Sequence, residues 1–274
     1  MTLRLWHQSF TVLEDLPDYA ATLKRHFARV ASPGTEVVMH GMHAGTYTSE
    51  YPGTDIRHAA LQHLHATQFM LGGLAAEQAG FDAYMICTIP DPVLTETRSL
   101  LRIPVVGYGE SAMLVACMLG RRFGILNFIE EIGPQLEANA RRYGLGERLA
   151  AVRHVGFGFH DVAPAFTGDA APVIERFTEA ARAMIRLGAD VIIPGEAVLC
   201  VLLASQGVHR VDGVPIVDAL AVTVRMAEMM AGLRRVAGLE QNRTGYFTER
   251  PEPGRVEELV DFYGLRRLVP GSEA

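Results

Sequence analysis

One residue pattern occurs twice in the chain, as Gly80-Phe81-Asp82-Ala83-Tyr84-Met85-Ile86-Cys87-Thr88 and again as Gly188-Ala189-Asp190-Val191-Ile192-Ile193-Pro194-Gly195-Glu196. Each copy has a glycine that can end a helix, an acidic residue, an apolar run typical of a buried strand and a polar residue at its end. In both copies the final polar residue lies six positions after the acidic one. We therefore predict an internal duplication in which Thr88 and Glu196 lie at equivalent strand ends.

The rest of the chain alternates short apolar runs with longer helical patterns, which is typical of βαβ units around a mostly parallel sheet. The predicted strands are residues 3–6, 36–39, 83–86, 105–107, 123–126, 151–155, 191–193 and 216–217. The predicted helices lie near residues 16–31, 55–79, 93–101, 111–119, 130–143, 171–187, 197–206 and 219–236. The predicted fold class is α/β, with two pseudosymmetric Rossmann-like lobes, each a mostly parallel sheet flanked by helices, and an active-site cleft between them.

The same alternation sets the expected domain bounds. Residues 1–104 together with 214–236 are expected to form the first lobe, and residues 105–213 the second. Residues 237–274 differ in composition and are interpreted as a C-terminal arm, with a short amphipathic helix near 257–268, that covers its own lobe or a neighbouring subunit. Open α/β sheets bind ligands at the carboxyl ends of their strands, so Thr88 and Glu196 would face each other across the cleft.

Composition excludes several classes of protein. The chain has 274 residues, a net charge of −6, 49% apolar and 20% charged residues, and no basic stripe that would hold a nucleic-acid backbone. Its apolar runs are too short to span a membrane, and residues 1–10 lack the pattern of a signal peptide. We expect a cytoplasmic protein that binds a small-molecule substrate and, because little of its surface is charged, a homo-oligomer.

Cysteine and histidine spacing does not predict a metal centre. The three cysteines are widely spaced without a CxxC pair, which excludes a disulfide framework and a cysteine-rich zinc site. The ten histidines lack the spacing of known zinc motifs, so no metal is expected, although a site built from His7, His40 or His43 stays open. The Gly107–Ala112 run matches the weak GxGxxA pattern of dinucleotide sites and is interpreted mainly as a helix start.

Four runs of this chain resemble the aspartate/glutamate/hydantoin racemase superfamily, most closely its hydantoin-racemase-like branch. These runs are residues 82–92, 103–112, 119–126 and 188–196, and the resemblance covers roughly residues 1–236. It implies two pseudosymmetric lobes, a cleft between them and no cofactor. In such racemases one cysteine follows each repeat strand, and the two thiol groups flank the substrate carbon. Here those positions carry Thr88 and Glu196, and Cys87 falls one residue before the first, so both expected thiols are replaced.

The replaced thiols determine which residues are candidates for chemistry. Glu196 is interpreted either as a general base or as the cap of the following helix, and Thr88 either as a hydrogen-bond donor to the substrate or as a turn cap. Cys87 could replace the missing thiol only if the strand end departs from regular alternation. Candidates for substrate binding are His7, Gln8, Ser9, Asn127, Glu110 and His160. Asp91 is expected to open the next helix.

Because Glu196 is the one residue of the two repeats that is a plausible base, the sequence favours a reaction that needs a single base. The first expectation is a cofactor-independent enzyme in which Glu196 promotes hydrolytic ring opening of a small carboxylated or cyclic-amide substrate, hydantoin- or thiazoline-like. The alternative is an amino-acid or hydantoin racemase or isomerase that transfers a proton at the alpha carbon with Glu196 and a displaced Cys87. A third interpretation is a non-catalytic protein that binds a small molecule in the cleft.

Overall fold

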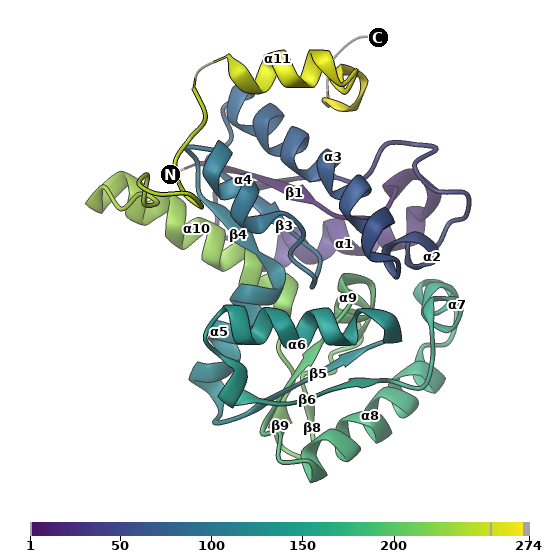
Figure 1. Cartoon of the computed structure of the whole chain (residues 1–274). Coiled ribbons are helices and arrows are strands. Elements are labelled where there is room, and N and C mark those ends of the chain that lie inside the picture. Colours follow the sequence, from purple (N-terminus) through teal and green to yellow (C-terminus); the bar gives the residue numbers. More distant parts are fainter. Residues whose placement is uncertain (1, 253, 271–274) are drawn as a thin grey trace.

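The computed structural model describes residues 2–252 and 254–270, and these residues form two halves that each contain a parallel sheet (Figure 1). The first sheet has the strand order β2-β1-β3-β4 and the second has the order β6-β5-β7. The strands of the first sheet are β1 (Leu3–Gln8), β2 (Thr35–His40), β3 (Ala83–Ile86) and β4 (Val105–Gly107). The remaining strands are β5 (Phe123–Asn127), β6 (Leu149–His154), β7 (Val191–Pro194) and the antiparallel pair β8 (Arg210–Val211) and β9 (Val214–Pro215). The α/β fold class predicted from the sequence is therefore confirmed.

The internal duplication is visible in the topology, because β5, β6 and β7 repeat the order of β1, β2 and β3. The acidic residue of each repeat forms equivalent hydrogen bonds to backbone amides. The Asp82 carboxylate accepts a hydrogen bond from the Arg4 amide at 2.8 Å, and the Asp190 carboxylate accepts from the Arg121 and Arg122 amides at 2.9 and 2.8 Å. Each carboxylate thus ties the start of a third strand to the start of the neighbouring first strand.

Helices cover both sheets. In the first half lie α1 (Pro17–Val30), α2 (Gly53–Ile56), α3 (Ala59–Gln78) and α4 (Leu94–Leu100). In the second half lie α6 (Gly133–Arg142), α7 (Phe159–Val162), α8 (Ala171–Arg186) and α9 (Ala197–Ser205). The helices α5 (Tyr108–Leu119) and α10 (Ala219–Ala237) pack on each other beside the two halves, and α11 (Arg255–Phe262) lies over the first half near α3 (Figure 1). None of the helices within the described residues is both long and apolar enough to cross a membrane.

The chain passes between the halves slightly later than the sequence indicated. The expected bounds fall just before residues 105 and 214, but β4 pairs with β3 in the first sheet, and Ile216 bridges Ile192 of the second sheet. Each half therefore keeps its own last strand, and the crossings follow at α5 and α10. The physical reason is that the backbone groups of a buried strand must form hydrogen bonds with a neighbouring strand, so the strand stays with its sheet. A helix forms its backbone hydrogen bonds within itself and can therefore connect the two halves.

Candidate functional site

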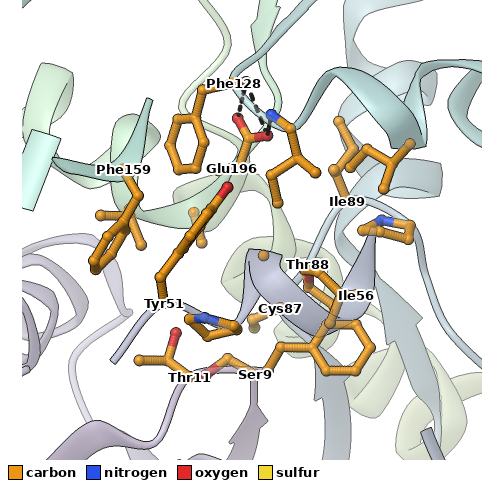
Figure 2. Close-up of a pocket in the computed structure, with 18 of the residues that line it drawn as sticks. Ser9, Thr11, Tyr51, Ile56, Cys87, Thr88, Ile89, Phe128, Phe159 and Glu196 are labelled. Carbon is orange, nitrogen blue, oxygen red and sulfur yellow. Dashed lines mark hydrogen bonds between the residues drawn. The ribbon is translucent and has the colours of Figure 1, made fainter. Parts of the chain in front are cut away.

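A cavity of about 60 Å³ lies where loops from both halves meet at the carboxyl ends of the strands (Figure 2). Residues that follow β1, β3, β5 and β7 line it, together with the segment around α2 and the first residue of α7. The lining residues are Ser9, Phe10, Thr11, Tyr19, Tyr51, Pro52, Gly53, Ile56, Cys87, Thr88, Ile89, Pro90, Phe128, Ile129, Ile132, Phe159, Glu196, Ala197 and Val198. Most are apolar, and none is a lysine or an arginine. This is the position in which open α/β sheets bind ligands.

Glu196 is the acidic side chain of this lining, and only 8% of its surface is exposed. The Phe128 amide donates to both of its carboxylate oxygens at 3.0 Å, and the Ile129 amide donates to Oε1 at 3.1 Å. Glu196 is the N-cap residue of α9, as one of the two interpretations has it, but its side chain makes no cap hydrogen bond to that helix. Burial raises the pKa of Glu196 to about 7, against the lowering effect of the Phe128 and Ile129 amides. A carboxyl group with such a pKa exists in both protonation states near neutral pH.

Cys87 and Thr88 both line the cavity, although alternation along a strand would send their side chains to opposite faces. The reason is that β3 ends at Ile86, so both residues belong to the turn that follows. The Cys87 amide donates to the Gln8 carbonyl at 2.8 Å, and the Thr88 carbonyl accepts from the Asp91 amide at 3.1 Å. Burial raises the pKa of the Cys87 thiol well above its usual range, which keeps the thiol protonated.

Of the three candidates in the first loop, the structure brings only Ser9 to the cavity. The Gln8 side chain is occupied elsewhere, since it accepts from the Trp6 indole at 3.1 Å and donates to the Gly41 carbonyl at 2.7 Å. His7 is fully buried away from the cavity, and burial lowers its pKa to about 3, so it stays neutral. The expectation that His7 and Gln8 contact the substrate is not met by this geometry, because both belong to strand β1 itself.

The other three candidates for substrate binding also lie outside the lining. The Asn127 side chain donates to the Ile129 carbonyl, and in this way it shapes the turn that presents amides to Glu196. The Glu110 carboxylate pairs with the Arg98 guanidinium. His160 is exposed, next to the lining residue Phe159.

The histidines considered for a metal site have other contacts. The His40 ring stacks on Trp6 with centroids 3.3 Å apart, and His43 Nε2 lies 3.0 Å from the Leu268 carbonyl oxygen. Among residues 2–252 and 254–270, no group of three or more His, Cys, Asp or Glu side chains is arranged to hold a metal ion.

Sequence reasoning missed the aromatic side chains of the cavity. The Tyr51 ring, from the loop before α2, stacks on Phe159 of the second half with centroids 4.8 Å apart and an interplanar angle of 11°. Phe128 lies beside them, with its centroid 6.4 Å from that of Tyr51. No periodic pattern or repeat marks these loop positions. The aromatic character of Phe128, next to the candidate Asn127, was the one available signal.

Comparison with known proteins gives consistent results. Residues 17–227 match the family model described as Asp/Glu/Hydantoin racemase. The hydantoin racemase of Pseudomonas sp. (strain NS671) is 31% identical over 158 residues, 57% of this chain and 61% of that protein, so this match spans less than two thirds of the relative. The hydantoin racemase of Rhizobium meliloti is 26% identical over 214 residues, 75% of this chain and 85% of that protein.

Solved structures show the same similarity at the level of the fold. The allantoin racemase of Pseudomonas fluorescens has a TM-score of 0.74 and 25% identity, and the match covers 92% of this chain and 98% of that chain. The allantoin racemase of Klebsiella pneumoniae has a TM-score of 0.71 and 24% identity, covering 92% of this chain and 94% of that chain.

Proposed function

Because the chain belongs to the Asp/Glu/hydantoin racemase family, we propose that it is a racemase or isomerase that transfers a proton at a carbon next to a carbonyl group, with Glu196 as one base. The observation that carries this proposal is the buried Glu196 carboxyl in the cavity, whose pKa of about 7 allows it to accept and return a proton near neutral pH.

Racemisation needs a proton donor on the face of the carbon opposite the base. Glu196 lies on one side of the drawn cavity, and Cys87 and Ser9 lie on the other (Figure 2). Burial holds the pKa of the Cys87 thiol high, so the resting thiol is protonated and carries a proton that it can donate. We assign Cys87 the role of donor, with Thr88 and Ser9 as hydrogen-bonding groups at the same end.

The proposed reaction consists of two proton transfers. The Glu196 carboxylate removes the proton from the carbon, and the electron pair of the C–H bond moves toward the carbonyl oxygen to give an enolate. The Cys87 thiol then gives its proton to the opposite face of the carbon and becomes a thiolate. The carboxylic acid loses its proton to water and the thiolate regains one from water, which restores the starting state. The opposite enantiomer reacts by the reverse of these steps, in which the Cys87 thiolate removes the proton and the Glu196 carboxylic acid donates one.

The lining favours a neutral substrate with an apolar substituent. It has no lysine or arginine to pair with a carboxylate, and its aromatic and aliphatic side chains suit an apolar group. A cyclic ureide such as a 5-substituted hydantoin meets both conditions, in agreement with the names of the relatives.

Hydrolytic ring opening, which the sequence favoured first, has less support than proton transfer. The family and its matched relatives are named racemases, and they point to the racemase alternative. The replaced cysteine positions were the reason for expecting hydrolysis. That reason weakens once Cys87 is placed in the cavity lining opposite Glu196.

The deciding experiment incubates each enantiomer of 5-benzylhydantoin with the protein in deuterated water. We expect deuterium at the ring carbon, measured by mass spectrometry, and loss of optical purity, measured by chiral chromatography. Glu196→Gln should abolish both, whereas the exposed control Glu175→Gln should match the wild type. Ring-opened product without deuterium at that carbon would favour the hydrolase, and full activity of Glu196→Gln would remove Glu196 from the mechanism.

A second pair of variants tests the donor. Cys87→Ser should slow racemisation strongly, because a hydroxyl is a much weaker acid than a thiol. The control Cys117→Ser changes a half-buried cysteine that does not line the cavity and should leave the rate unchanged. Equal rates for both variants would exclude Cys87 as the donor.

A further inference from the structure

We infer that Tyr51 is a further catalytic residue of the proposed reaction, and that its hydroxyl donates a hydrogen bond to the substrate carbonyl oxygen next to the carbon from which Glu196 removes the proton. This assignment rests on the proposed function. Tyr51 comes from the loop before α2 and lines the cavity together with Glu196 (Figure 2).

The backbone of Tyr51 is firmly held. Its carbonyl oxygen accepts hydrogen bonds from the Thr54 amide at 3.2 Å, from the Thr54 hydroxyl at 2.9 Å and from the Ser49 hydroxyl at 3.2 Å. These bonds close a tight turn, and α2 begins two residues later at Gly53. The side chain therefore starts from a fixed position, as a preorganised catalytic group must.

Gly53 provides the space that the Tyr51 ring occupies. A Cβ atom at residue 53 would lie 2.0 Å from Cζ and 2.2 Å from the hydroxyl oxygen of Tyr51. No side chain other than hydrogen fits there while the ring keeps its place. The local sequence is thus arranged so that the phenol folds back over its own turn and into the cavity.

The second half of the molecule completes the position of the ring. Its parallel stack on Phe159 and its contact with Phe128 join the two halves across the cavity. The phenol oxygen points toward the Glu196 carboxyl (Figure 2). Within the described residues the hydroxyl makes no hydrogen bond, so it is available to a substrate.

The electrostatic surroundings keep the hydroxyl a donor. Burial, and after it the negative charge of Glu196, raise the pKa of Tyr51 above its usual range, so the phenol remains protonated while Glu196 is ionised. When Glu196 takes the proton from carbon, the electron pair moves onto the carbonyl oxygen. A hydrogen bond from the phenol strengthens as that negative charge develops, and the phenol keeps its own proton.

The first test is Tyr51→Phe, which removes the hydroxyl and keeps the ring on Phe159. We expect kcat for racemisation of 5-benzylhydantoin to fall about 100-fold with KM changed less than about threefold, because one donor to a developing oxyanion is lost. Tyr246→Phe, at a tyrosine that is 90% exposed, is the matched control and should match the wild type. An unchanged kcat in Tyr51→Phe would overturn the assignment.

The second test keeps the phenol and moves it. Gly53→Ala should displace the ring and cause a similar loss of kcat, whereas Gly232→Ala in α10, where the added Cβ meets no neighbouring atom, should have little effect on it. Urea denaturation of both variants verifies that they remain folded. A folded Gly53→Ala protein with full activity would contradict the placement of the ring.

Binding separates this inference from the proposed function. Calorimetry would compare 5-benzylhydantoin with 4-benzylimidazolidin-2-one, which has the same substituent but lacks the carbonyl next to the substituted carbon. Tyr51→Phe should weaken binding of the first about twofold, in line with the small change expected in KM, and leave the second unchanged, since only the first offers the acceptor. That difference would support the hydrogen bond from Tyr51 to the substrate carbonyl even if the wild type exchanged no deuterium. Absence of deuterium exchange would reject only the racemase activity. Equal effects on both ligands, or no binding of either by the wild type, would overturn the Tyr51 assignment.

Discussion

At the scale of single residues, the Glu196 carboxyl is subject to two opposing effects. Burial disfavours its charged form, and the Phe128 and Ile129 amides favour that form. Burial is the larger effect, and it raises the pKa from 4.5 to about 7. The free energy of unfolding is therefore lowered in the same pH range in which Glu196 loses its proton and can act as a base.

A pH dependence of folding follows from this shift. Below pH 4.5 the Glu196 carboxyl is protonated in both the folded and the unfolded state, so the stability that its raised pKa confers is fully present. As the pH rises to 7, the unfolded chain loses this proton first, and folding stability falls by up to about 3 kcal/mol. Urea denaturation should show the wild type losing this amount relative to Glu196→Gln between pH 4.5 and 8. A stability difference between the wild type and Glu196→Gln that stays constant with pH would refute the shift.

The two amides that hold Glu196 predict a chemical rescue. Glu196→Ala leaves the Phe128 and Ile129 amides without their acceptor, in a cavity open to small solutes. Successive amides of this kind bind anions, so added formate or acetate should raise the residual deuterium exchange about tenfold. Chloride at the same ionic strength serves as the control. Equal rates with chloride and with formate would show that the amides do not hold an external carboxylate.

Residue-level rules also explain an error of sequence reasoning. Alternation along a strand placed Cys87 and Thr88 on opposite faces, but the rule ends with the strand at Ile86. Strand ends are the least predictable part of an element, and catalytic side chains gather there. The sequence therefore identified Thr88 and Glu196 as equivalent positions, but it could not predict that Cys87 would share the cavity.

At the scale of elements, Asp91 connects three of them. Its carboxylate accepts from the Gly109 amide at 2.9 Å and the Glu110 amide at 2.7 Å, both at the start of α5, and from the Tyr143 hydroxyl at 2.7 Å after α6. Asp91 lies just before α4, as expected, and its carbonyl accepts from the Leu94 amide at 3.4 Å, but its side chain reaches a helix that starts 17 residues later. It thereby fixes the turn that presents Cys87 and Thr88.

Loss of this carboxylate should weaken the whole arrangement. Asp91→Ala leaves two amides and a hydroxyl unpaired in a buried position, which we expect to lower the free energy of unfolding by about 2 kcal/mol. Asp169→Ala removes an exposed carboxylate that accepts one amide hydrogen bond at 2.9 Å and should cost clearly less. Denaturant titrations measure both. Equal losses would mean that Asp91 acts only as an ordinary cap.

Element bounds were predicted well where hydrophobic periodicity was strong. The helix expected at 219–236 is α10 (Ala219–Ala237), and the helix expected at 171–187 is α8 (Ala171–Arg186). The helix expected at 55–79 is instead two helices, α2 and α3, because His58 has an extended backbone with φ −100° and ψ 116°. The short helix α7 was missed, since four residues carry no periodic signal.

At the scale of the whole molecule, the duplication was predictable and the cavity wall was not. The repeat predicted that Thr88 and Glu196 face a common cleft, and both residues line the cavity. Tyr51 and Phe128 come from loops and Phe159 begins the short helix α7, and none of the three belongs to the repeated pattern. The scaffold thus follows from the duplicated strands, whereas the substrate contacts depend on loops in which each half differs. The homo-oligomer expected from the low charged fraction stays a prediction.

The arm that follows α10 packs on the first half of its own chain. The Arg243 guanidinium donates to the Arg98 carbonyl at 2.9 Å and also to the Leu101 carbonyl, and Arg250 donates to the Leu100 carbonyl at 2.9 Å. These bonds attach the arm to the end of α4. Of the two positions that the sequence left open for the arm, the structure shows the one on its own lobe.

If these two arginines hold the arm, removing them should release it without disturbing the cavity. Hydrogen bonds from charged groups contribute about 1.5–3 kcal/mol, so the double variant Arg243→Ala/Arg250→Ala should raise the rate of limited proteolysis between residues 239 and 252 at least about tenfold. Arg255→Ala, which removes an exposed pair with Glu258 at 2.7 Å, is the control and should leave that rate near the wild-type value. Racemisation should persist in both variants, because none of the three arginines lines the cavity. An unchanged proteolysis rate in the double variant would show that other contacts hold the arm. Loss of racemisation would show that the arm is needed to keep the cavity in its active shape.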